Sequence, residues 1–305
     1  MINNKETILM KFNGKDVPVS ADPKEREKFI LSYKKQSAQE QRERIFQDIK
    51  TNGPSSIEEA ESNILTLLAL KTNTLNDETF FKAKLLLLKS LYIVLCTKYN
   101  IPLNKVTYKS VLSKNDPCLC PPERPAVCHH LAHMPASALN SDHSTIIGYI
   151  IMNQNHLMKL NFASTIFSFC HEFRHILQTT ECSKTEFDNK FYYFNSQKPN
   201  YFLWAASPGE TEADSFAYKE LLYFLSEAAK EHKNVSFVNA TQQIRERYVK
   251  SSISHQLLKL AYAPVLFFSK LKRKLTLAQI EKSMQVDSKS TTTPNDDNED
   301  GSEKQ

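Results

Sequence analysis

Two histidines and a glutamate in one short segment have the types and spacing of a metal-dependent hydrolytic site. His171, Glu172 and His175 form the pattern His-Glu-x-x-His. In a helix, residues four positions apart lie on the same face, so both imidazoles can bind one metal ion. Zinc takes such nitrogen ligands, and a glutamate beside the first histidine can reach a water molecule on the ion. The segment predicts a zinc site at which Glu172 acts as a general base.

The flanking residues indicate that the segment is helical. Apolar side chains recur at steps of three and four positions and form one stripe, which consists of Ile166, Phe169, Cys170, Phe173, Ile176 and Leu177. Polar side chains fall on the other side. We expect a helix whose back packs in a core and whose histidines face a cleft. The alternative is an ordinary helix with two surface histidines.

A third ligand is expected, because a catalytic zinc ion has three protein ligands and an open position for water. Glu210 and Asp214 are four positions apart in a second predicted helix, which covers residues 208–232. Glu210 can bind the metal. Asp214 can accept a hydrogen bond from the outer nitrogen of His171 or His175 and so fix its tautomer.

Glu210 has a second interpretation. Residues 207–210 read Ser-Pro-Gly-Glu, which matches a capping box with proline at the first helical position. Glu212 is a second possible ligand, but its neighbour four positions on is Phe216, which offers no acceptor. Glu210 is therefore the preferred ligand.

The two motifs together resemble those of the gluzincin class of zinc metallopeptidases, to which thermolysin belongs. The segment Glu210–Ala217 is similar to the second motif of ImmA/IrrE-type metallopeptidases, and the resemblance covers residues 144–225. It implies a zincin-like core, in which a small sheet with an edge strand lies beside the His-Glu-x-x-His helix. It also implies a protein or peptide substrate.

Residues 145–152 are β-branched and apolar and are predicted to form a strand that leads into this helix. In the zincin arrangement, the edge strand binds peptide substrate by backbone pairing. On that hypothesis, Gly148–Asn153 line the cleft. The alternative is a strand in the middle of the core.

Peptide hydrolysis also needs a group that stabilises the oxyanion. Tyr192, Tyr193, Tyr218 and His232 are eligible, and the sequence does not select among them. A competing hypothesis is a non-enzymatic helical interaction or regulatory protein with a structural or degenerate metal site. The peptidase is favoured because a structural zinc ion has no use for Glu172.

Residues 118–133 contain a second group of metal-binding residue types, namely Cys118, Cys120, Cys128, His129, His130 and His133. The Cys-x-Cys spacing is not that of a usual zinc knuckle, which disfavours a structural zinc site. The segment can instead supply an inhibitory thiol to the catalytic metal or form a proline-stiffened surface loop, which is the preferred interpretation. Cys96 and Cys170 fall on apolar helical faces and are predicted to be buried free thiols.

Composition limits the class of protein. With 5 glycines in 305 residues, the chain is expected to be mainly helical within an α+β fold. The net charge of +5 is mild and no basic stripe dominates, so nucleic-acid binding is not expected. The start of the chain does not read as a signal peptide, and the most apolar run, residues 85–96, is too short to span a bilayer. We expect a cytoplasmic protein, with leaderless secretion left open.

The order of patterns predicts four regions. A β-hairpin around Asn13-Gly14 and three helices, at about residues 22–50, 56–71 and 76–100, come first. A strand is predicted at residues 105–111, within an otherwise irregular stretch that continues to residue 143. The regions are an N-terminal β-hairpin and helical region at 1–110, a Pro/Cys/His-rich loop at 111–143, a zincin-like core with C-terminal helices at 144–286, and a disordered acidic tail at 287–305.

Overall fold

The computed structural model describes residues 7–70, 75–133, 139, 145–184, 186–187, 207–232, 235 and 244, all within one compact unit, Met1–His255. The fold is α+β and mainly helical, as predicted. The predicted C-terminal helices and acidic tail lie outside the described residues, except for Ile244, which packs in the core.

The chain begins with the predicted hairpin, formed by β1 (Thr7–Phe12) and β2 (Lys15–Ser20), which pair antiparallel. The turn residues Asn13 and Gly14 both have positive φ angles, of 49° and 79°. This backbone conformation suits asparagine and glycine and explains why the dipeptide marks the turn.

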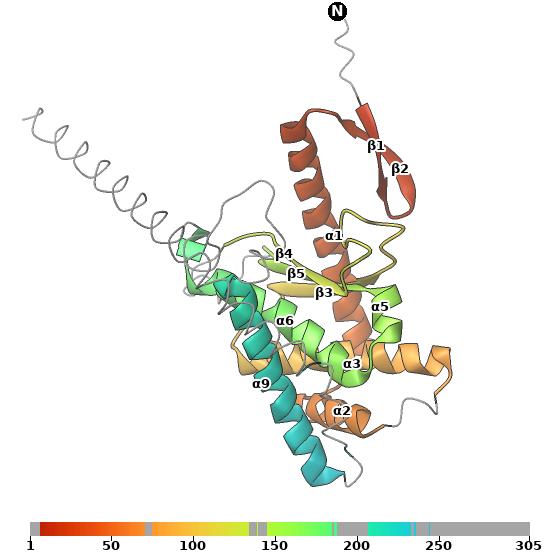
Figure 1. Cartoon of the computed structure of the whole chain (residues 1–305), viewed down its shortest axis with the longest axis vertical. Coiled ribbons are helices and arrows are strands. Elements are labelled where there is room, and N and C mark those ends of the chain that lie inside the picture. Colours follow the sequence, from red (N-terminus) through yellow and green to blue (C-terminus); the bar gives the residue numbers. More distant parts are fainter. Residues whose placement is uncertain are drawn as a thin grey trace, which may run out of the picture. The chain divides into compact units, whose positions relative to one another are not determined.

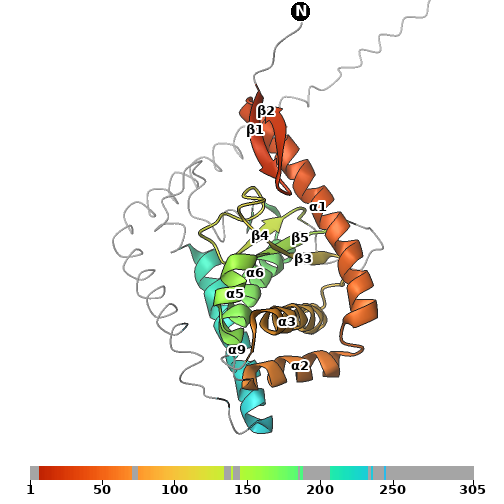
Figure 2. The ribbon, with the colours of Figure 1, turned by 90° about the vertical axis from the view of Figure 1, so that its right-hand side faces the viewer.

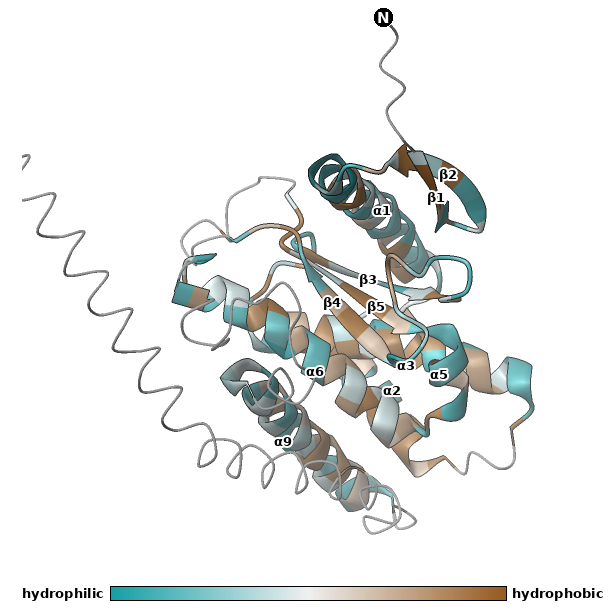
Figure 3. Cartoon of the chain, turned by 45° about the horizontal axis from the view of Figure 1, so that its top comes forward, coloured by the Kyte–Doolittle hydropathy of each residue, from teal (hydrophilic) through white to brown (hydrophobic). Residues whose placement is uncertain are grey.

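Three helices follow, as the sequence predicts: α1 (Pro23–Asn52), α2 (Ile57–Ala69) and α3 (Asp77–Lys98). Asp22, Ser56 and Asn76 precede them, and each side chain accepts a backbone hydrogen bond from the first turn. The α1 helix is mostly hydrophilic (Figure 3) and buries only Ser37, Ala38 and Ile45.

A three-stranded sheet has the order β3-β5-β4 and is formed by β3 (Val106–Val111), β5 (Gly148–Asn153) and β4 (Ala126–His130). The β5 strand pairs parallel with β3 and antiparallel with β4. All six residues of β5 are buried. The prediction that Gly148–Asn153 form the edge strand is therefore wrong, because both edges of β5 are already paired. The β4 strand forms one edge of the sheet, and the sequence did not predict this strand.

Two more helices carry the candidate site. A short helix, α5 (Gln154–Lys159), links β5 to α6 (Phe162–Glu181), and α9 (Pro208–Glu231) comes later in the chain. The α6 and α9 helices pack side by side (Figure 1). None of the helices in the described part of the chain is long and apolar enough to cross a bilayer.

The helices cover both faces of the sheet. One face packs against α1 and contains Tyr149 and Ile151. The other packs against α6 and contains Ile150 and Met152, in the larger core that also includes α2, α3 and α9. Figure 2 shows α3 between α2 and the sheet layer. The predicted boundary between residues 110 and 111 falls inside β3, so the N-terminal region and the predicted core share one sheet.

Candidate metal centre

The α6 helix is buried both along its apolar stripe and on the side that carries the histidines. The predicted apolar stripe is confirmed, since five of its members are fully buried and Leu177 is nearly so. His171 and His175, on the other side, are only 7% and 5% exposed. Both histidines are therefore buried.

The start of α6 is anchored by a buried lysine. The Asn161 side chain accepts a hydrogen bond from the backbone N–H of Ser164. Lys84 Nζ of α3 donates to the carbonyl oxygens of Leu160 and Asn161, at 2.7 and 2.9 Å, and to the hydroxyl of Thr165. Burial lowers the pKa of Lys84 to about 7. These bonds fix α6 relative to α3 at the entry to the site helix.

The opposite part of α6 lies directly against the sheet at Gly148. A Cβ atom at Gly148 would lie 2.6 Å from Cγ1 of Ile176, which is closer than two carbon atoms can approach. Glycine at this position lets α6 approach the sheet at the turn that holds His175.

Three ligand atoms converge between α6 and α9. His171 Nε2 and His175 Nε2 lie 3.2 Å apart. The Glu210 carboxylate oxygens lie 3.3 Å from His171 Nε2 and 3.4 Å from His175 Nε2. Ligand atoms about 2.1 Å from a tetrahedral ion lie about 3.4 Å from one another. The three side chains are all buried, and with one ligand atom from each lying within 4.8 Å of the others, they could hold a metal ion.

Hydrogen bonds fix the orientation of both rings. His171 Nδ1 lies 2.8 Å from Asp214 Oδ1, so the predicted pairing of Asp214 with a ring nitrogen is confirmed for His171. His175 Nδ1 lies 2.9 Å from Gln178 Oε1, and Gln178 Nε2 donates to the carbonyl of Gly209. Because both partners accept, each Nδ1 carries a hydrogen, which leaves Nε2 as the ring nitrogen that faces the centre and would bind a metal ion.

The centre is electrostatically suited to a cation. Burial disfavours the charged form of His171, but its hydrogen bonds to Asp214 and Glu210 outweigh this and raise its pKa to about 10. Burial also acts against the Glu210 carboxylate. The charge of His175 and the hydrogen bonds from both rings outweigh this and hold the pKa of Glu210 well below its usual range. The buried carboxylates of Asp214 and Glu210 thus favour a positive charge at the centre.

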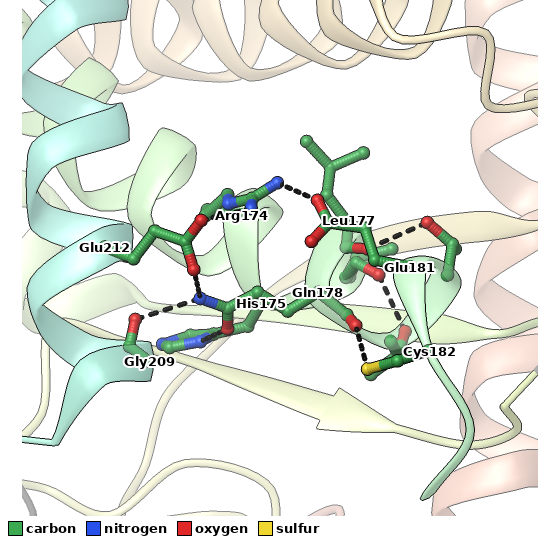
Figure 4. A network of polar contacts seen from close by, with 11 residues as sticks. Arg174, His175, Leu177, Gln178, Glu181, Cys182, Gly209 and Glu212 are labelled. Atoms are coloured by element: carbon green, nitrogen blue, oxygen red, sulfur yellow. Dashed lines mark hydrogen bonds and ion pairs between the residues drawn. The ribbon is translucent and has the colours of Figure 1, made fainter. Parts of the chain in front are cut away.

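Glu212, the other possible ligand, has a different role. It forms an ion pair with Arg174 at 2.5 Å and accepts a hydrogen bond from Gln178 Nε2 at 3.2 Å. Arg174 also pairs with Glu181. Figure 4 shows these groups joining α6 to α9 beside His175. Glu212 therefore holds Gln178, the residue that orients His175, and is not one of the three candidate ligands.

The capping-box interpretation of Glu210 is wrong. Ser207 occupies the cap position of α9, but its side chain makes no capping hydrogen bond, and its buried hydroxyl has no partner among the described residues. The Glu210 carboxylate points to the histidines instead of the helix start. Pro208 at the first helical position needs no hydrogen-bond acceptor, which reduces the need for a cap.

Glu172 lies between the two histidines in sequence and remains partly exposed. Two of the predicted oxyanion groups lie away from the centre. Tyr218 lies 8 positions after Glu210 on α9, which is about 12 Å along the helix axis. His232 follows the last residue of α9, 22 positions after Glu210, which is about 33 Å along the axis. Tyr192 and Tyr193 lie outside the described residues.

The Cys/His-rich segment does not form a metal site of its own. Within the described ranges, the only group of three converging metal-binding side chains is His171, His175 and Glu210. Cys120 is buried, and His129 lies 2.6 Å from the carbonyl of Leu119. The segment is not simply a surface loop either, because residues 126–130 form β4. All six cysteines are free, and Cys96 and Cys170 are buried as predicted.

The sequence names His130 only as part of the Cys/His-rich segment and does not place it near the centre. The His130 ring of β4 lies 6.3 Å from the His175 ring, centroid to centroid, at an interplanar angle of 85°. Nothing in the sequence around His130 links it to His175, which is 45 positions away, because the pairing of β4 with β5 brings them together.

Known proteins offer no further guide to this site: no protein-family model, no curated protein and no solved structure matches the chain. The α+β class and the buried His171, His175 and Glu210 group are features of the structure itself, whereas the gluzincin resemblance rests on the two sequence motifs.

Proposed function

We propose that the chain is a zinc-dependent metallopeptidase of the gluzincin type. His171, His175 and Glu210 hold the ion, Asp214 and Gln178 orient the two rings, and Glu172 is the general base. The observation that carries the proposal is the convergence of the two Nε2 atoms, 3.2 Å apart, with the Glu210 carboxylate, whose two oxygens lie 3.3 and 3.4 Å from them.

The donor set favours zinc. Two imidazole nitrogens and one carboxylate form a common catalytic zinc set, whereas calcium and magnesium prefer oxygen ligands. Two histidines and a carboxylate also suit iron(II). Glu172 beside the first ligand favours a hydrolytic site, because a base next to the ion serves to activate water.

Glu172 supplies the acid–base chemistry. A zinc ion held by these ligands would lower the pKa of a water molecule and polarise a carbonyl group. Glu172 accepts a proton from the attacking water as the water oxygen bonds to the carbonyl carbon. It then delivers the proton to the amine nitrogen as the carbon–nitrogen bond breaks. Its partial exposure keeps the carboxylate within reach of water, in contrast to the buried ligands.

The edge strand β4 provides a place for substrate. It packs against α6, and only one of its two edges is paired within the sheet. We assign to β4 the pairing with an extended peptide that the resemblance implied for residues 148–153. The substrate is accordingly a protein or peptide in extended conformation.

A second candidate function is a regulatory protein with a structural metal ion. The observation that favours it is the burial of all three ligands, which are 5–7% exposed, because structural sites are closed. The two functions differ in what they require of Glu172, which a structural site does not need.

Hydrolysis tests the proposal. Zinc-loaded wild type and Glu172→Gln are incubated with a mixed peptide library, and new termini are identified by mass spectrometry. We expect new termini from the wild type and none from Glu172→Gln, with one zinc ion bound to each. Glu181→Gln, on the same helix but paired with Arg174 on the surface, serves as a control and should cleave. Equal cleavage by Glu172→Gln, or none by zinc-bound wild type, would contradict the peptidase.

A further inference from the structure

Strand alternation places part of the Cys/His-rich segment at the metal centre. In β4, Ala126, Cys128 and His130 pair with Met152, Ile150 and Gly148 of β5. Paired residues point to the same face of a sheet. Ile150 and Met152 belong to the core on the α6 side. Cys128 and His130 therefore face α6, whereas His129 faces α1.

Gly148 lets α6 approach the sheet next to His130. It pairs directly with His130, and it is the residue whose missing side chain lets Ile176 of α6 approach the sheet. His175 precedes Ile176 on the same turn of α6. The close approach of helix and sheet at Gly148 thus brings the His130 ring against the His175 ring.

The His130 ring is held by its neighbours. The Phe187 ring contacts it at 5.3 Å between centroids. His130 Nδ1 lies 4.0 Å from the thiol sulfur of Cys128. Among the described residues, His130 Nε2 has no hydrogen-bond partner. A half-buried imidazole beside metal-binding residues, with a nitrogen that none of the described residues bonds, is placed to bind a polar group of a ligand.

We propose that His130 is a catalytic residue that donates a ring N–H hydrogen bond to the carbonyl oxygen of the bound peptide. This inference rests on the proposed peptidase function and deepens it. When water attacks the carbonyl carbon, the carbon–oxygen π pair moves to the carbonyl oxygen, and the proton of the water passes to Glu172. His130 stabilises the resulting negative oxygen and undergoes no net change. The carbonyl re-forms as the carbon–nitrogen bond breaks and Glu172 protonates the amine.

His130 is not assigned as a fourth metal ligand. It does not belong to the group of ligand atoms that lie within 4.8 Å of one another. It comes from the sheet, whereas the ligands come from α6 and α9. The His130 ring lies on the sheet side of the centre and belongs to β4, the strand to which the extended substrate is assigned.

The test uses the full chain with cobalt(II) in place of zinc and acetohydroxamate as the probe. Cobalt reports its ligands by visible absorption, and acetohydroxamate is an anion whose oxygen can occupy the position of the substrate oxygen. The variants are His130→Ala, His130→Gln, which keeps an N–H donor, and His129→Ala as the control from the opposite face of β4. Absorption is recorded without the probe and during titration with it.

We expect the cobalt spectrum without the probe to be the same in all four proteins. His130→Ala should bind acetohydroxamate about tenfold or more weakly, the loss typical of one hydrogen bond to a charged group. His130→Gln should recover part of the affinity, and His129→Ala should match the wild type.

Equal affinity in His130→Ala and wild type would overturn the role of His130, as would a wild type that binds cobalt but not acetohydroxamate. A cobalt spectrum changed by His130→Ala before the probe is added would make His130 a ligand and also overturn the proposal. A wild type that binds no cobalt would instead contradict the metal centre itself. Circular dichroism of each variant identifies misfolding, and His130→Gln then decides the outcome if His130→Ala does not fold.

Discussion

The two ligand histidines differ in the partner that orients each ring. His171 has the carboxylate of Asp214, and His175 has the neutral amide of Gln178. Asp214 could be predicted from the sequence because a carboxylate one turn from a ligand is a recognisable pattern. Gln178 could not, because its role depends on Gly209 and Glu212 of α9, which fix its amide.

Asp214→Ala should weaken zinc binding about 10–100-fold, because His171 then loses the group that fixes its tautomer. Asp214→Asn keeps an acceptor oxygen and should lose less. Competition with a chromophoric chelator at pH 7 gives both affinities. Wild-type affinity in Asp214→Ala would show that His171 needs no partner to bind the ion.

Lys84 makes stability depend on pH. Its pKa in the folded chain is about 7, below the ~10.4 of an unfolded chain, so between these values the unfolded chain binds more protons. The free energy of unfolding that Lys84 contributes should therefore rise with pH. Urea unfolding at pH 6 and pH 9 should show the wild type gaining stability relative to Lys84→Met at the higher pH. An unchanged difference would mean that the three acceptors retain the charged ammonium.

An element could be predicted from the sequence where its signal is local, and could not where its conformation depends on distant residues. Helices α1, α2, α3 and α6 carry local caps and regular apolar spacing, and the sequence located them within a few residues. The β4 strand has only five residues, and two of them are histidines. Its conformation comes from pairing with β5, a nonlocal interaction, so the segment was predicted to be irregular. The same pairing makes β5 a central strand.

At the element scale, Gly148 sets the distance between α6 and the sheet. Gly148→Ala should lower the free energy of unfolding by about 1–3 kcal/mol, because the new Cβ overlaps Ile176. Ile176→Ala removes the overlapping atoms, so the double variant should be more stable than the sum of the single changes predicts. Urea unfolding of the four proteins provides the cycle. Strict additivity would show that α6 and the sheet separate at this point without cost.

At the scale of the molecule, the site depends on segments that are far apart in the chain. The ligands come from α6 and α9, the anchoring lysine from α3, and the neighbouring histidine from β4. The sequence predicted the ligand group because each motif is local and their chemistry is complementary. It did not predict the burial of the histidines, since that depends on how α9 and β4 pack over α6.

The most direct test of the account is the metal content of the purified chain, measured by elemental mass spectrometry. Wild type is compared with His175→Ala, Glu210→Ala and the control Glu181→Ala, which removes a carboxylate that pairs with Arg174 and is not near the ligands. The account predicts one zinc ion per chain in the wild type and the control and none in the two ligand variants. Zinc that persists in both ligand variants, or a wild type that binds none, would contradict the metal centre.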